Sequence, residues 1–135
     1  MSHPIRATVS HFELPAASSA RAARFYRRVF GWRVERLAAG GNDYYTIRTD
    51  APDQVPPGAH VGAIGGGLGA PAVIGAEQPL LVLHLHGCTL TECLLAISRA
   101  GGEIVEPPRQ VGKMGFFARF RDPEGNLLGL WSDGG

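Results

Sequence analysis

The sequence has little of several features that mark specialised classes of protein. Its 135 residues include two cysteines, Cys88 and Cys93, which are too few and too poorly spaced for a disulfide scaffold or a zinc knuckle. No apolar run approaches the roughly 20 residues needed to span a bilayer. Net charge is +1 and lysine occurs once, at Lys113, so no basic cluster extends beyond one helix face. We therefore expect neither a nucleic-acid partner nor a membrane partner.

The remaining composition is that of a folded domain. Hydrophobic residues make up 44% and charged residues 19%, which is close to the globular average. The first residues lack the charged-then-apolar order of a signal peptide, and we expect a cytoplasmic protein. Basic charge comes almost wholly from arginine, alongside many alanines and glycines, a bias that suits a GC-rich bacterial genome.

The first half of the chain predicts a strand, a helix and further strands. Residues 8–14 alternate as a strand does, and Ser18 or Ser19 can cap a helix that Gly31 is placed to end. The arginines of this helix predict a solvated face. Strands follow at 32–37 and 44–48, where Tyr44 and Tyr45 could line a pocket, although aromatic residues at strand positions are more often core. Residues 50–58 form a loop, and 61–68 form a strand whose glycines are expected to prevent a regular ladder.

The second half repeats this pattern after a predicted linker at 69–79. Residues 80–86 alternate again, and Thr89 with Glu92 fits a capping box before a helix that ends at Gly101. Strands are predicted at 103–105, 115–121 and 126–131, with a tight turn at 122–125.

The two halves superpose at an offset of 71 residues, which places Gly31 on Gly102 and Val34 on Val105. The prediction is one α+β domain, 1–135, made of two β-α-β-β-β modules at 5–68 and 80–132. In each module one face of the strands is apolar and is expected to pack against the helix. The other face is then not covered by a helix. Two modules side by side would form a concave, partly open mixed sheet, and small ligands bind in concave pockets.

Two segments carry a family resemblance. The segment HFELPAASSARAARFYRRVFGW resembles the opening of the vicinal oxygen chelate superfamily, which includes glyoxalase I, extradiol dioxygenases and bleomycin resistance proteins. GKMGFFARFRDPEGNLLGLW resembles its closing strands. The resemblance implies the same fold, a small organic ligand, and a homodimer, because cavities in that family are often built across two chains. It specifies activity much less well, since one scaffold hosts many chemistries.

Metal-dependent members of that family place four ligands around one ion, and the resemblance carries over only one of them. His11 matches the ligand position of the first strand, but the offset of 71 places Val82 at its counterpart. The closing glutamate would fall at Gly129, seven residues after Asp122, and the last strand of the first module offers no side-chain ligand. We therefore expect no metal and no other cofactor, and a divalent metal is disfavoured.

Strand alternation leaves polar residues on the face that the helices do not cover. His11 and Glu13 are the candidate catalytic residues, and the whole predicted ligand-binding cavity is His11, Glu13, Val82, His84, His86, Leu127, Gly129 and Trp131. These groups could orient an organic ligand that stacks on Trp131, act as general acid and base, or assemble a displaced metal site. His84 and His86 could equally lie at a wet sheet edge or at a dimer interface.

The sequence thus leads to two hypotheses. The first is a metal-independent small-molecule-binding protein of the sequestering or resistance type. The alternative is a lyase, isomerase or dioxygenase that acts on a small oxygenated substrate and could use a divalent metal. Whether the chain is an enzyme stays open at this point.

Overall fold

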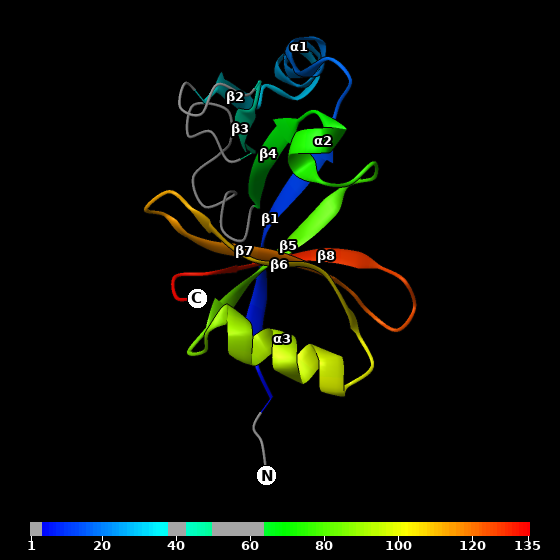
Figure 1. Ribbon diagram of the computed structural model, residues 1–135. Helices are drawn as coiled ribbons and strands as arrows, with labels where there is room; N and C mark the ends of the chain where they lie inside the picture. The colour runs from blue at the N-terminus through cyan, green and yellow to red at the C-terminus, as the bar shows by residue number, and fades with distance from the viewer. Residues whose placement is uncertain (1–3, 38–42, 50–63) are drawn as a thin grey trace. The chain divides into compact units, whose positions relative to one another are not determined.

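A computed structural model of the chain describes residues 4–37, 43–49 and 64–135 (Figure 1). The chain forms two compact units: unit 1 is Met1–Ser10 with Leu81–Gly135, and unit 2 is His11–Leu80. Strand β1 (Arg6–Pro15) is divided between them after Ser10. Among the described residues, no helix is both long and apolar enough to cross a membrane.

Unit 2 is a small mixed sheet with one long helix. After β1 come α1 (Ser19–Phe30), β2 (Arg33–Arg36), β3 (Tyr45–Arg48), β4 (Gly65–Gly69) and a one-turn helix α2 (Pro71–Ile74). The strand order is β2-β3-β4-β1, in which β1 and β4 are parallel and the other pairs antiparallel. The linker predicted at 69–79 therefore contains the end of β4 and a short helix.

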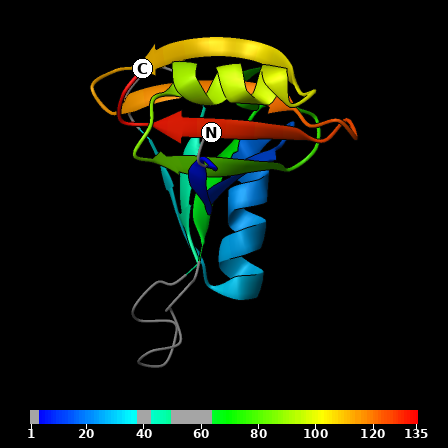
Figure 2. The same ribbon diagram turned by 90° about the horizontal axis from the view of Figure 1, so that it is seen from below.

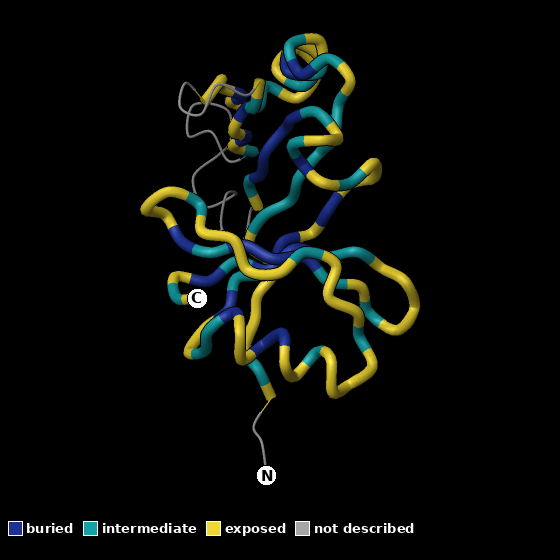
Figure 3. Tube along the Cα trace, viewed as in Figure 1, coloured by how far each residue is buried: buried dark blue, intermediate teal, exposed yellow. Residues whose placement is uncertain are grey.

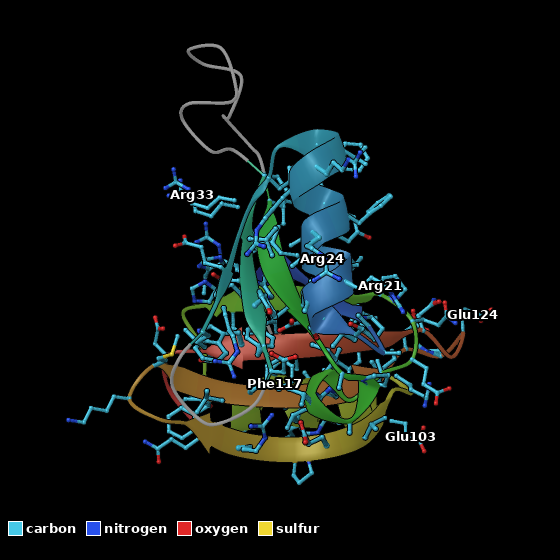
Figure 4. The ribbon with its side chains drawn as sticks, turned by 90° about the horizontal axis from the view of Figure 1, so that it is seen from above. Arg21, Arg24, Arg33, Glu103, Phe117 and Glu124 are labelled. Atoms are coloured by element: carbon cyan, nitrogen blue, oxygen red, sulfur yellow. The ribbon has the colours of Figure 1, made fainter. Side chains whose placement is uncertain are left out.

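Local signals set the limits of α1 as predicted. The Ser18 side chain caps the helix by accepting a hydrogen bond from the backbone N–H of Arg21, and Gly31 ends it in the left-handed conformation at φ 68°. Arg21 and Arg24 project from the exposed side of α1 (Figure 4). The core beneath it consists of Ala23, Val34, Tyr45, Ile47 and Leu68.

The C-terminal half of α1 departs from the helical apolar pattern. Phe25, Val29 and Phe30 share that spacing, yet each is more than half exposed. The rings of Phe25 and Phe30 gather with those of Tyr26 and Trp32, and Tyr26 stacks on Trp32 at a centroid distance of 5.1 Å. The described residues therefore leave an apolar patch on α1 exposed, and its most exposed members are Phe25, Val29 and Phe30.

Unit 1 has a longer sheet with its helix on one face. It contains β5 (Leu80–His86), α3 (Leu90–Arg99), β6 (Glu103–Val111), β7 (Gly115–Arg121) and β8 (Leu127–Ser132), in the order β1-β5-β8-β7-β6. β5 and β8 are parallel, and β8-β7-β6 is antiparallel. α3 lies along the sheet (Figure 2) and covers a core of Leu85, Leu90, Cys93, Leu94, Ala118 and Leu130.

The capping box and the closing turn are confirmed. Thr89 Oγ1 accepts the N–H of Glu92 at 3.1 Å, and the Glu92 carboxylate accepts the N–H of Thr89 at 3.0 Å. In the turn, the N–H of Gly125 donates to the carbonyl of Asp122 at 3.0 Å. The Asp122 carboxylate also accepts bonds from Glu124 and Asn126, and those with Asn126 are the main cause of its lowered pKa.

Both modules follow the order β-α-β-β-β in an α+β fold with mixed sheet, as predicted. α1 begins at Ser19 and α3 at Leu90, which are 71 residues apart. The strand predicted at 61–68 corresponds to β4, although 61–63 and the loop predicted at 50–58 lie outside the described residues. The expectation that its glycines prevent a regular ladder was wrong. β4 keeps a regular ladder with β1 and β3, and it is buried along most of its length (Figure 3). β6 is also longer than the predicted 103–105, because register shifts near its two prolines let it continue to Val111.

Candidate functional site

The uncovered face of unit 2 carries a hydrogen-bonded triad of His11, Glu13 and Tyr44. His11 Nε2 lies 3.2 Å from Glu13 Oε1, and the Tyr44 hydroxyl donates to both oxygens of Glu13 at 3.1 and 2.9 Å. The side chain of Glu13 is 15% exposed and that of His11 36%. Glu13 therefore sits between two partners, and the imidazole is the member of the triad that is open to solvent.

Tyr44 can act in this triad only as a neutral hydrogen-bond donor. Burial raises its pKa well above the ordinary value of 10.0, and the charge and hydrogen bond of Glu13 raise it further. If His11 donates its Nε2 proton to Glu13, the lone pair of Nδ1 becomes available as a proton acceptor. This is the geometry of a histidine base oriented by a carboxylate.

Glycines of β4 make room for the triad. A Cβ atom at Gly67 would lie 1.7 Å from the Tyr44 hydroxyl and 2.3 Å from Glu13 Oε2. Gly65 is paired with His11 across the β1–β4 ladder, and its Cβ would meet only the backbone of Ile47. The glycines that were expected to weaken the strand thus leave space above it on the side of His11 and Glu13.

The uncovered face of unit 1 carries the other predicted cavity residues. Val82 pairs with Gly129 and His84 pairs with Trp131 across β5 and β8, so their side chains share one face, as does Leu127 by alternation. His84 and His86 lie side by side, with ring centroids 4.9 Å apart. His86 Nε2 is 2.9 Å from the hydroxyl of Thr8, and His84 Nε2 is 3.9 Å from exposed Asp133.

Sequence reasoning missed four residues of this face. Phe117 pairs with Trp131 and Arg109, and Arg119 pairs with Gly129 and Glu106. Arg119 forms a hydrogen-bonded ion pair with Glu106, and its guanidinium lies 4.7 Å from the centroid of the Phe117 ring. The signal was present in the alternation of GFFARFR, which places Phe117 and Arg119 on the side opposite Ala118.

The residues present do not fit the metal site that the family resemblance implies. A Cβ at Gly129 would lie 2.9 Å from Phe117 Cζ and 3.2 Å from Val82 Cγ2, so an aromatic ring fills the space a glutamate would need. At the counterpart of His11 stands Val82, which has no donor atom. In residues 4–37, 43–49 and 64–135, no three His, Cys, Asp or Glu side chains are grouped so that they could hold a metal ion.

Each unit therefore brings together its own share of the predicted site. His11 and Glu13 meet in unit 2 and gain Tyr44, while Val82, His84, His86, Leu127, Gly129 and Trp131 share a face of unit 1. That the two sets line one cavity stays a prediction.

Comparisons with known proteins agree with this fold. A family model described as the Glyoxalase/Bleomycin resistance protein/Dioxygenase superfamily matches residues 8–130. A search of curated proteins found no match. Methylmalonyl-CoA epimerase from Mycobacterium tuberculosis is similar in structure, with 17% identity over 93% of this chain and 87% of that one and a TM-score of 0.60.

Two further solved structures are similar. The Mn(II)-bound glyoxalase from Novosphingobium aromaticivorans has 18% identity over 96% of this chain and 38% of that one, with a TM-score of 0.51. A variant methylmalonyl-CoA epimerase from Streptomyces coelicolor in complex with 2-nitronate-propionyl-CoA has 13% identity over 93% of each chain, with a TM-score of 0.60. At these identities the likeness shows the fold alone.

Proposed function

Because the chain belongs to the glyoxalase/bleomycin resistance protein/dioxygenase superfamily, we propose that it is a metal-independent protein that binds a small organic molecule. The observation that carries this proposal is the position of the Phe117 ring over Gly129. An aromatic surface beside Trp131 suits an organic ligand, whereas a divalent metal needs three or four donor atoms. The complex of a similar epimerase with an acyl-CoA compound supports a small-molecule ligand.

Elemental analysis tests the proposal directly. The purified protein is dialysed with and without a chelator and its metals are quantified by mass spectrometry. A thermal-shift screen of Mn²⁺, Ni²⁺, Zn²⁺ and small metabolites runs in parallel. We expect less than one tenth of an equivalent of any transition metal and a melting temperature raised by organic compounds alone. One equivalent of tightly bound metal after dialysis would overturn the proposal.

A second candidate function is proton transfer catalysed by unit 2. It is favoured by the triad of His11, Glu13 and Tyr44, in which a carboxylate orients a solvent-accessible imidazole. Proton transfer at carbon is a step common to lyases and isomerases.

Deuterium incorporation separates the two candidates. Small hydroxy acids, keto acids and thioesters are incubated with the protein in D₂O, and exchange at carbon is followed by NMR. An enzyme of this kind would catalyse exchange that is lost in His11→Ala and kept in Arg99→Gln, a control at an exposed residue of α3. A His11→Ala variant with full exchange would refute the assignment of His11 as the base.

We also propose that the chain forms a homodimer. The apolar patch of Phe25, Val29 and Phe30 on α1 supports association, because exposed apolar clusters of this kind mark interfaces. Light scattering coupled to size-exclusion chromatography tests it, with Phe30→Ser as the disrupting variant and Arg24→Ser as the control. A monomeric wild-type protein at micromolar concentration would refute the dimer.

A further inference from the structure

We infer that the uncovered face of unit 1 binds a planar aromatic carboxylate, with Trp131 holding the ring and Arg109 holding the carboxylate. The inference rests on the proposed function and names the class of its ligand. It depends on a row of four residues that cross neighbouring strands.

The row consists of His84 on β5, Trp131 on β8, Phe117 on β7 and Arg109 on β6. Each is paired with the next across the sheet, so all four side chains lie on the face opposite α3. Neighbouring strands lie about 4.8 Å apart, so two strand spacings, about 10 Å, separate Trp131 from Arg109. That distance suits an aromatic ring system with one attached carboxylate.

Two glycines let the rings of this row lie close to the backbone. A Cβ at Gly115 would be 2.8 Å from Trp131 Cζ2, and a Cβ at Gly129 would be 2.9 Å from Phe117 Cζ. Phe117 is buried, at 8% exposed, so it packs beneath the row and offers no open face for stacking. Trp131 is half-buried, and it is the member of the pair that a ligand can reach.

Charge at the Arg109 end of the row favours a ligand with a single negative charge. Two guanidinium groups, Arg109 and Arg119, and one carboxylate, Glu106, give this end a formal charge of 2 − 1 = +1, while the Asp133 carboxylate lies near His84 at the opposite end. Glu106 makes its shorter contact with Arg119, and the Nε of Arg109 lies 3.7 Å from its other oxygen.

Arg109 is placed to meet the carboxylate of a ligand. Its side chain is 52% exposed, and its guanidinium lies 5.7 Å from the centroid of the Phe117 ring. That ring therefore fixes the guanidinium at the end of the aromatic row. A planar guanidinium pairs with a carboxylate through two parallel hydrogen bonds, which matches a monoanionic ligand.

Calorimetry with two matched probes tests the inference. The probes are 2-naphthoate and its neutral counterpart 2-naphthamide, and the variants are Arg109→Gln, Trp131→Leu and the control Arg99→Gln. Arg99 is an exposed arginine at the end of α3, away from the row.

We expect 2-naphthoate to bind the wild type at least tenfold more tightly than 2-naphthamide. Arg109→Gln should lower the affinity for 2-naphthoate about tenfold and leave that for 2-naphthamide unchanged, since only the carboxylate forms an ion pair with the guanidinium. Trp131→Leu should weaken both probes alike, and Arg99→Gln neither. If Arg109→Gln does not fold, the affinities of the wild type for both probes are measured at increasing ionic strength. Only the affinity for 2-naphthoate should fall, because salt screens the ion pair with Arg109.

Two results would overturn the inference. Equal affinities for the two probes would refute the carboxylate contact and leave the proposed function standing. No binding of either probe at millimolar concentration would refute the ligand class, and the proposed function would then fail only if the metabolite screen also gave no ligand.

Discussion

Replacing Gly129 by alanine tests the physical reason for which the chain cannot hold the family's metal ligand. The added methyl group would lie 2.9 and 3.0 Å from Phe117 Cζ and Cε1 and 3.2 Å from Val82 Cγ2. The ring has little freedom to move away, because Arg119 and Arg109 lie 4.7 and 5.7 Å from its centroid.

Two opposing effects set the magnitude. Gly→Ala at a compatible backbone conformation stabilises a protein by about 0.4–1 kcal/mol through the unfolded state. Overpacking a filled core costs about 1–3 kcal/mol. We expect the second effect to win and the free energy of unfolding to fall by about 1.3 kcal/mol, the difference between the midpoints of the two ranges.

Urea denaturation followed by circular dichroism measures this change. In a Phe117→Leu background the ring atoms that clash are gone, so Gly129→Ala should become neutral or stabilising, and the double-mutant cycle should give a coupling of about 1–2 kcal/mol. Gly134→Ala is the matched control, because its Cβ would meet only Thr89 Cγ2 at 3.9 Å. A Gly129→Ala variant as stable as the wild type, or one whose cost persists without the ring, would refute the reasoning.

Three further predictions concern hydrogen bonds. Tyr44→Phe removes the hydrogen-bond donor to half-buried Glu13. In urea denaturation the free energy of unfolding should fall by about 1–2 kcal/mol, somewhat less than for a fully buried bond to a charged group. A fall below about 0.5 kcal/mol would contradict the triad. The raised pKa of Tyr44 gives a stabilisation that is complete below pH 10 and lost as pH rises further, because the unfolded chain releases its proton first. Unfolding midpoints measured between pH 8 and 11 should therefore fall more steeply above pH 10 in the wild type than in Tyr44→Phe, and parallel curves would refute this assignment. Thr89→Ala should lower the free energy of unfolding by about 1 kcal/mol through loss of the helix cap. The exposed control Ser98→Ala should change the free energy of unfolding by less than about 0.5 kcal/mol.

The uncovered faces could be predicted only in part. Alternation placed His11 beside Glu13 and His84 beside His86, because successive side chains of a strand point to opposite faces. The same rule could not say that Tyr44 leaves the core while Tyr45 enters it, since that depends on the register of β3 against Leu68. Tyr44 was missed as a site residue for this reason, whereas Phe117 and Arg119 were missed although the alternation of their strand places them on this face.

The sequence by itself determined the order of the elements, the ends of the helices and the departure from the family's metal ligands. Caps, turns and ligand positions depend on residues close together in the chain, such as Ser18, Gly31 and Thr89 with Glu92. Only the tertiary structure decided why the glycines of β4 and β8 are there. The space that a side chain would occupy at these glycines is filled by Tyr44, Glu13 and Phe117, which come from other strands or the segment beside them. Contacts of that kind exist only once the sheet has formed.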